Sequence, residues 1–240
     1  MKKKITVVLL AVLAVTAVYG SEFPDYYSII TEIDALTGDS NTGTTVFPLL
    51  RIPSGGKAES MGTAQSALAA DASSVLFNPA LSSVLDLTEI SFLHNNWIAD
   101  TSIETLLFAK RFDDLGIAAG AKLLYLPFTA YDDWAAPVAK GYPLEALAVL
   151  NTSYNFFSSY YFNGVSAGIS LKAGYRHIPE VFYANQSSLA VMADAGLYSS
   201  FNLFKFYNSR DRNFAVGIAF KNAGIETLGE PLPTELSAGI

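Results

Sequence analysis

From about Thr88 to the end of the chain, apolar residues alternate with small or polar residues at every second position. A period of two is typical of β-strands with one apolar face. It predicts strands at 88–98, 102–112, 115–127, 144–158, 163–177, 187–203 and 213–222, and the start of an eighth near Glu235. We therefore expect an all-β, antiparallel fold. Strand lengths near ten residues also suit tilted membrane strands.

The strand expected at 163–177 shows how its two faces differ. One face carries Val165, Ala167, Ile169, Leu171, Ala173 and Tyr175, and the other carries Ser166, Gly168, Ser170, Lys172, Gly174 and Arg176. A soluble β-sandwich fills its outer face with charged side chains. A face of small residues with sparse charge instead suits the crowded interior of a barrel whose bulky face meets lipid. We expect a transmembrane β-barrel, with the sandwich as the alternative because alternation cannot distinguish core from lipid.

The N-terminus resembles an export signal. Three lysines precede an apolar or small stretch from Ile5 to Val18, which is too short to cross a bilayer as a helix. We expect a cleaved signal peptide at 1–20, with an N-terminal membrane anchor as the alternative. Charged residues form 15% of the chain, against roughly 25% in soluble domains. Together these features predict export to the outer membrane.

Residues 21–87 separate the expected signal peptide from the strands. Turn formers without periodicity make 21–60 irregular, whereas the small residues of 62–72 predict short helices that end at Pro79. We expect this segment to plug the barrel formed by 88–240. Because the last strand stops after Ile240 at about half length, we expect a barrel that is incomplete at its C-terminus.

Loop lengths and aromatic residues suggest an orientation. The links 128–143, 178–186 and 223–234 are long, and the turns at 113–114 and 160–163 are short, as in barrels with long external loops. Aromatic residues gather at the expected periplasmic turns: Tyr154, Phe156, Phe157, Tyr160, Tyr161, Phe162, Phe201, Phe204, Phe206 and Tyr207. We interpret them as interfacial girdles, with the aromatic interior of a globular protein as the alternative.

The composition argues against several functional classes. No cysteine is present, so disulfides, thiol catalysis and a lipid anchor on cysteine are excluded. His94 and His177 lack the spacing of a metal-binding pair, and neither a nucleophile elbow nor a phosphate loop is found. A net charge of −7 makes nucleic acid an unsuitable partner. We expect no enzyme activity, metal site or cofactor.

Asp194 is an acid on an otherwise small inward face. Lys172 and Arg176 of the neighbouring strand are the bases expected to pair with it. We interpret these three residues as charges of the barrel lumen, with a gating role as the alternative to a structural ion pair.

Two stretches resemble a known family. They are 56–62 followed by 69–72, and Leu76-Phe77-Asn78-Pro79-Ala80 immediately before the first strand. They are similar to the FadL/PorV-like superfamily of outer-membrane barrels, and most similar to an uncharacterised spirochaetal branch of it. The resemblance implies about 8 of the family's 14 strands and places Asn78, Pro79 and Ala80 at the hatch turn. A simple helix stop before a strand is the alternative for these residues.

This resemblance implies uptake of hydrophobic small molecules, such as long-chain fatty acids, across the outer membrane. The expected partners are outer-membrane lipid, a hydrophobic ligand and the barrel assembly machinery. The alternatives are a PorV-like interaction or secretion-shuttle protein, a non-functional truncated barrel and a soluble periplasmic β-protein. A hydrophobic pocket among the hatch residues would favour transport, and an exposed aromatic surface around 131–142 would favour docking.

Overall fold

A computed structural model describes residues 45–158, 163–204, 212–225 and 227–240. The chain divides into two compact units, Met1–Gly43 and Thr44–Ile240, and the described residues belong to the second. The expected signal peptide and the first part of the expected hatch, up to residue 44, lie outside the described residues, as do Tyr160, Tyr161, Phe162, Phe206 and Tyr207.

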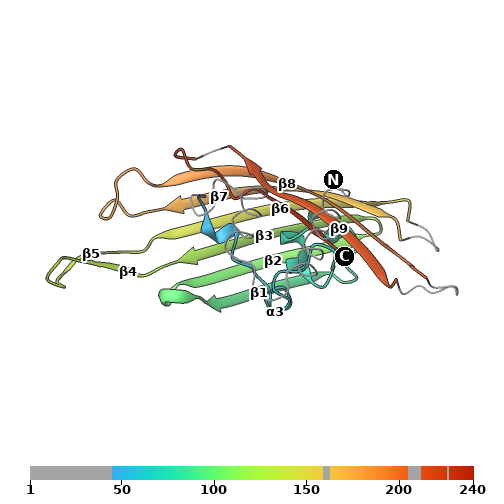
Figure 1. Ribbon diagram of the computed structural model, residues 1–240, viewed down its shortest axis with the longest axis horizontal. Helices are drawn as coiled ribbons and strands as arrows, with labels where there is room; N and C mark the ends of the chain where they lie inside the picture. Colours follow the sequence, from blue (N-terminus) through green and yellow to red (C-terminus); the bar gives the residue numbers. More distant parts are fainter. Residues whose placement is uncertain (1–44, 159–162, 205–211, 226) are drawn as a thin grey trace, which may run out of the picture. The chain divides into compact units, whose positions relative to one another are not determined.

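One antiparallel sheet dominates the described residues (Figure 1). Its strands are β1 (Glu89–Asn96), β2 (Ser102–Phe112), β3 (Leu115–Tyr125), β6 (Leu144–Phe156), β7 (Val165–His177), β8 (Ser188–Phe201), β9 (Phe214–Gly224) and β10 (Glu235–Gly239). They are paired in this order as eight neighbours. The all-β fold and the eight expected segments are confirmed. The sheet is open, with β1 and β10 at its edges, so the described residues do not close the expected barrel.

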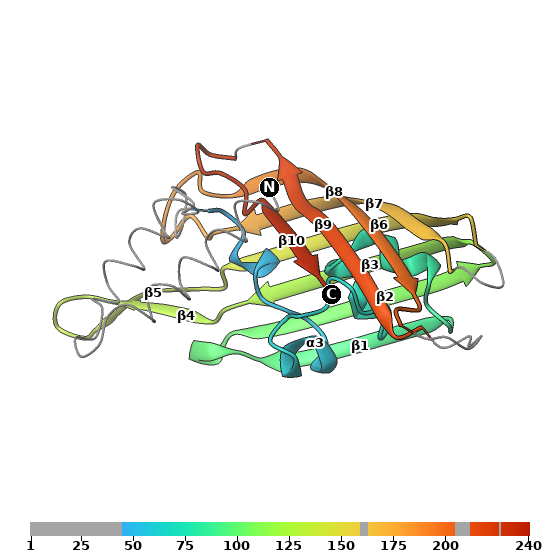
Figure 2. The same ribbon diagram turned by 45° about the vertical axis from the view of Figure 1, so that its right-hand side comes forward.

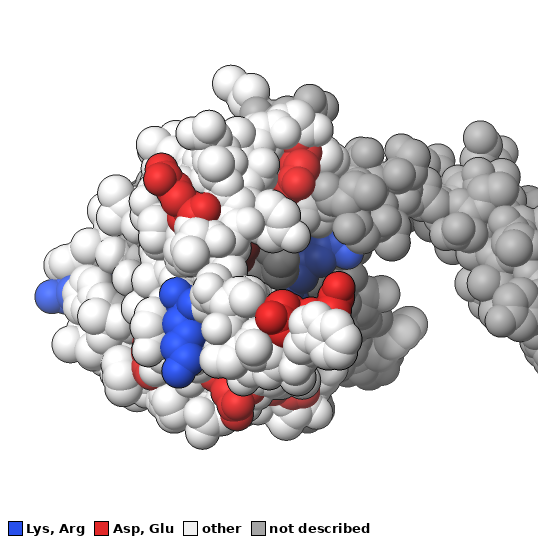
Figure 3. Space-filling model, turned by 90° about the vertical axis from the view of Figure 1, so that its left-hand side faces the viewer, with Lys and Arg blue, Asp and Glu red and all other residues white. Residues whose placement is uncertain are grey.

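A second, two-stranded sheet lies within the long link expected at 128–143. It consists of β4 (Phe128–Tyr131) and β5 (Pro137–Gly141), which form a hairpin between β3 and β6. These strands are too short to produce a clear alternation, and their register shifts at Ala130/Tyr131. Seen from the end that carries this hairpin, charged side chains form scattered groups on a mostly uncharged surface (Figure 3).

The helical segments differ from those expected. They are η1 (Pro48–Leu50), α3 (Gly56–Ser60), η2 (Ala72–Leu76), η3 (Pro79–Ser83) and η4 (Ile98–Asp100). No helix forms over 62–71, because α3 has already ended and Gly62 and Thr63 adopt positive φ angles. The short helix η2 ends at Leu76, ahead of Pro79 as expected, but a further helix, η3, begins at Pro79. Proline fits the first turn of a helix, where its missing N–H is not needed, and it holds the preceding Asn78 in an extended conformation.

The segment 45–88, called the plug below, lies against the concave inner face of the sheet (Figure 2). Within it, η3 contacts β2, β3, β6, β7 and β8. Two apolar clusters join the plug to the sheet. One combines Val46, Phe47 and Leu49 with Ile103, Leu147, Val149, Ala190, Met192 and Leu232, and the other combines Ala72, Val75 and Leu85 with Leu107, Ala109 and Ala118.

The polarity of the two strand faces is the reverse of that in a soluble sheet, because the bulky apolar face is exposed and the face of small and charged residues is buried. In β7, Ile169 and Leu171 are 57% and 59% exposed, whereas Ser170 and Lys172 are 1% and 5% exposed. The face of small and charged residues is therefore the inner one, as the sequence predicts. Among the described residues, the two sheets are this eight-stranded sheet and the β4–β5 hairpin.

Candidate functional site

The turn Asn78-Pro79-Ala80 is buried at the centre of the plug. The Asn78 side chain caps η3, because its Oδ1 accepts a hydrogen bond from Ala80 N at 3.0 Å. Its Nδ2 donates to Ser66 O at 2.8 Å and to Leu197 O at 3.1 Å. One side chain thus joins two parts of the plug to strand β8.

Glycines on the inner face leave room for the plug backbone. A Cβ atom on Gly168 of β7 would overlap the Pro79 carbonyl, and one on Gly196 of β8 would overlap the Asn78 side chain. A Cβ atom on Gly116 of β3 would overlap the backbone between Ser82 and Ser83. The small-residue face therefore exists because the plug's main chain lies directly on it. We call these glycines and the polar side chains around them the plug seat.

Neutral hydrogen bonds complete the plug seat. Asn151 of β6 donates through Nδ2 to Pro79 O at 3.0 Å and to Ser170 Oγ at 2.9 Å. Its Oδ1 accepts from Ser82 Oγ at 2.5 Å, and Ser82 Oγ lies 2.7 Å from Ser153 Oγ. Sequence reasoning missed this network. Its signal is the polar alternation of Asn151 and Ser153 in a strand whose other face is apolar.

A charged cluster lies farther along the same strands. Lys172 Nζ is 2.6 Å from Asp194 Oδ2 and donates to Asn222 Oδ1 at 2.8 Å. Asn222 N donates to Asp194 Oδ1 at 2.7 Å, and Asn222 Nδ2 donates to Pro233 O at 3.0 Å. Because ions buried this deeply need a partner and hydrogen bonds, this cluster ties β7, β8 and β9 to the link before β10.

The position of Asn222 depends on a β-bulge. The register between β8 and β9 shifts at Ala193/Ala195, and Asn222 has a φ of 58°. Asparagine tolerates such a conformation better than most residues. The sequence contains no separate signal for the bulge, so reasoning from alternation did not find Asn222.

Arg176 is not part of this cluster, and its expected pairing with Asp194 is wrong. Asp194 is opposite Ser170 in the β7–β8 register, six positions from Arg176. At about 3.3 Å per residue, the backbone positions of Arg176 and Asp194 are about 20 Å apart along the strand direction. Arg176 instead lies 3.7 Å from Glu145 and 3.4 Å from Glu230.

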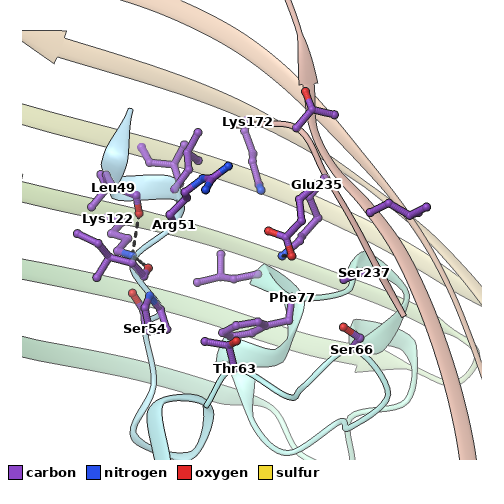
Figure 4. Close-up of a pocket in the computed structure, with 18 of the residues that line it drawn as sticks. Leu49, Arg51, Ser54, Thr63, Ser66, Phe77, Lys122, Lys172, Glu235 and Ser237 are labelled. Carbon is purple, nitrogen blue, oxygen red and sulfur yellow. Dashed lines mark hydrogen bonds and ion pairs between the residues drawn. The ribbon is translucent and has the colours of Figure 1, made fainter. Parts of the chain in front are cut away.

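A cavity of about 630 Å³ separates part of the plug from β3, β7, β9 and β10 (Figure 4). Its charged lining consists of Arg51, Lys122, Lys172, Lys221 and Glu235. Lys122 Nζ donates to the backbone carbonyls of Leu49 and Ile52, which fixes the start of the plug. Lys221 Nζ is 3.2 Å from Glu235 Oε1 and 5.8 Å from the centre of the Phe77 ring.

The histidines are separate from the cavity. His94 Nδ1 is 2.7 Å from Glu104 Oε1, and His177 Nδ1 is 3.2 Å from Ser187 Oγ. Over the described ranges, no group of three or more His, Cys, Asp or Glu side chains is placed to hold a metal ion. In the same ranges, no helix has both the length and the apolar character needed to cross a membrane.

The fold and the site define a class of β-protein whose curved antiparallel sheet holds a plug on a polar inner face. The chain belongs to the uncharacterised protein family UPF0164, whose family model matches residues 28–234.

Curated relatives described as UPF0164 proteins occur in Treponema pallidum (strain Nichols). One is 32% identical over 199 residues, covering 76% of this chain and 44% of the relative. Another is 30% identical over 182 residues, covering 72% and 51%, and a third is 28% identical over 183 residues, covering 73% and 35%. The expected spirochaetal relationship is confirmed by these proteins. The chain spans about half of their length or less.

Proposed function

We propose that this chain forms part of an outer-membrane β-barrel of the FadL/PorV-like type and that it serves the passage of small molecules past an internal plug. The observation that carries the proposal is the inverted polarity of the sheet. Hydrophobic small molecules, such as long-chain fatty acids, are the ligand class that the family resemblance suggests.

The outer face of the sheet is apolar over almost its whole width. The following outward side chains are each more than half exposed: Ile90, Phe92, Leu106, Leu150, Ile169, Leu171, Leu189, Val191, Leu197 and Leu236. Exposed apolar patches of this extent are rare on soluble monomers and are typical of lipid-facing barrel walls. Strands β2, β3 and β6 to β9 have 11 to 14 residues, enough to cross a bilayer at a tilt.

The interior supports passage rather than catalysis. Polar side chains, a cavity and a plug held by hydrogen bonds occupy the inner face, and barrels of this kind enclose either a channel or a plugged lumen. A closed lumen is part of this proposal, because the sheet of the described residues is open.

An outward substitution tests the membrane proposal directly. We expect Leu171→Arg to lower the membrane-inserted, heat-modifiable fraction sharply, because an arginine at mid-membrane costs about 2–4 kcal/mol in a barrel wall. Val138→Arg is the matched control, since Val138 is similarly exposed, at 61% against 59%, but lies in the β4–β5 hairpin. Recovery of both variants and the original chain in the aqueous fraction would contradict the proposal.

A second candidate function is docking of another protein, as in a PorV-like shuttle. The ring of Phe128 meets that of Phe182 edge to face at 5.2 Å, which joins the hairpin to the loop after β7. Around this contact Tyr131, Trp134 and Tyr183 are each more than 60% exposed. Aromatic residues are enriched in protein interfaces.

If docking is the function, Trp134→Ala combined with Tyr183→Ala should abolish cross-linking to an outer-membrane partner. The same variant should still insert and still take up small molecules at the original rate if the two functions are separate. Loss of uptake with unchanged cross-linking would favour transport alone.

A further inference from the structure

Basic side chains predominate among the charged residues that line the cavity beside the plug. Its lining includes four basic residues, Arg51, Lys122, Lys172 and Lys221, and a single acid, Glu235. Outside the lining, Asp194 neutralises Lys172. Glu235 pairs with Lys221. Two of the three lysines in the lining therefore have a carboxylate partner.

No carboxylate of the described residues contacts Lys122, although Glu59 is close enough to act on its charge. Lys122 is 6% exposed, and within the described part of the chain its ammonium contacts only the carbonyls of Leu49 and Ile52. Carbonyl dipoles satisfy hydrogen bonds but carry no net charge, whereas buried charges are generally paired. An ammonium has a third N–H, which is available to a ligand in the cavity.

The rest of the lining is suited to a polar ligand. Five hydroxyl side chains contribute to the wall: Ser54, Thr63, Ser66, Thr234 and Ser237. Thr234 and Ser237 already donate to the backbone carbonyls of Asn222 and Ala219. The hydroxyls of Ser54, Thr63 and Ser66 can donate to a carboxylate or phosphate oxygen, which an acyl chain does not offer. The volume of about 630 Å³ lies within the usual size of small-molecule sites.

We propose that this cavity binds a compact polar anion, carrying carboxylate or phosphate groups, between Lys122 and Lys221. Lys122 donates to the anion from the plug side. Lys221 shifts from Glu235 to the anion, on the side of β9 and β10. The site is independent of the transport function proposed above, because it needs only the folded cavity.

Calorimetry on the full chain purified in detergent tests this site, with citrate and inorganic phosphate as probes and laurate as the acyl comparison. We expect citrate or phosphate to bind, and the stronger of the two shows which anionic group the cavity prefers. Each of Lys122→Met and Lys221→Met should weaken that binding by about tenfold, the size expected for one charged hydrogen bond. Because Lys221 pairs with a half-exposed partner, its variant should fold even if Lys122→Met does not.

Two further variants make the test specific. Glu235→Gln should strengthen anion binding severalfold, because it removes the acid that competes for Lys221. Lys140→Met removes an exposed lysine of the hairpin, away from the cavity, and should leave binding unchanged. The proposal fails if neither anion binds, if laurate binds while citrate and phosphate do not, or if Lys140→Met weakens binding as much as Lys221→Met.

Discussion

The plug seat and the charged cluster are both buried on the inner face of β7 and β8, but they hold the structure together differently. In the seat, neutral side chains such as Asn78 and Asn151 bond to backbone, and glycines bring two main chains into contact. In the cluster, Lys172 and Asp194 form an ion pair next to a cavity. The difference shows that one sheet can hold a plug tightly at one position along its strands and leave a cavity lined by charged side chains at another.

The largest effect should come from the charged cluster. We expect Asp194→Ala to destabilise the fold by about 3–5 kcal/mol, because it leaves the Lys172 ammonium buried without its partner. Denaturant unfolding of the refolded chain measures this loss. Asp194→Leu combined with Lys172→Met should cost much less than Asp194→Ala alone. A double variant as unstable as the single one would show that the ion pair itself is not the cause.

A smaller effect should follow from filling the plug seat. We expect Gly168→Ala to cost about 1–3 kcal/mol, because the new Cβ atom would overlap the Pro79 carbonyl in a tightly packed contact. It should also raise the rate of trypsin cleavage after Lys57, in the plug. Gly56→Ala is the control, since a Cβ atom there has no neighbour within 4 Å. Equal cleavage rates in the two variants would show that the plug does not depend on this contact.

The smallest effect should come from Arg176. Its side chain is 26% exposed, and its contacts with Glu145 and Glu230 are 3.7 Å and 3.4 Å long. Partly exposed pairs contribute about 0–1 kcal/mol, so Arg176→Ala should leave the unfolding midpoint almost unchanged. A loss as large as that of Asp194→Ala would show that the contacts of Arg176 with Glu145 and Glu230 are far stronger than those of ordinary, partly exposed ion pairs.

The sequence predicted those features that repeat along a strand. Alternation located β7 to within a few residues and assigned Lys172 to the inner face, because successive side chains of a strand point to opposite faces of the sheet. It could not predict that Asn222 bonds to the ion pair. The β-bulge that places Asn222 there shifts the β8–β9 register, and no sequence pattern marks that shift.

Two further sequence predictions differ from the structure, each for a reason in the local chain. The hatch role of Asn78-Pro79-Ala80 rests on family resemblance and stays a prediction. Helix propensity predicts a helix before Pro79, where η2 lies, but it gives no sign of η3, which begins at Pro79. The pairing of Arg176 with Asp194 was wrong because the sequence shows which face each residue is on, but not which residues of β7 and β8 are opposite each other.

The glycine contacts of the plug seat imply that the sheet recognises the plug by the path of its main chain. Pro79 and the Ser82–Ser83 peptide meet Gly168 and Gly116 through backbone atoms, which every amino acid possesses. At these two contacts the glycines and the course of the plug backbone are constrained, whereas Asn78 and Ser82 also bond to the sheet through their side chains. A redesigned plug could carry new chemistry into the interior, provided that its backbone follows the same course and these two side chains are kept.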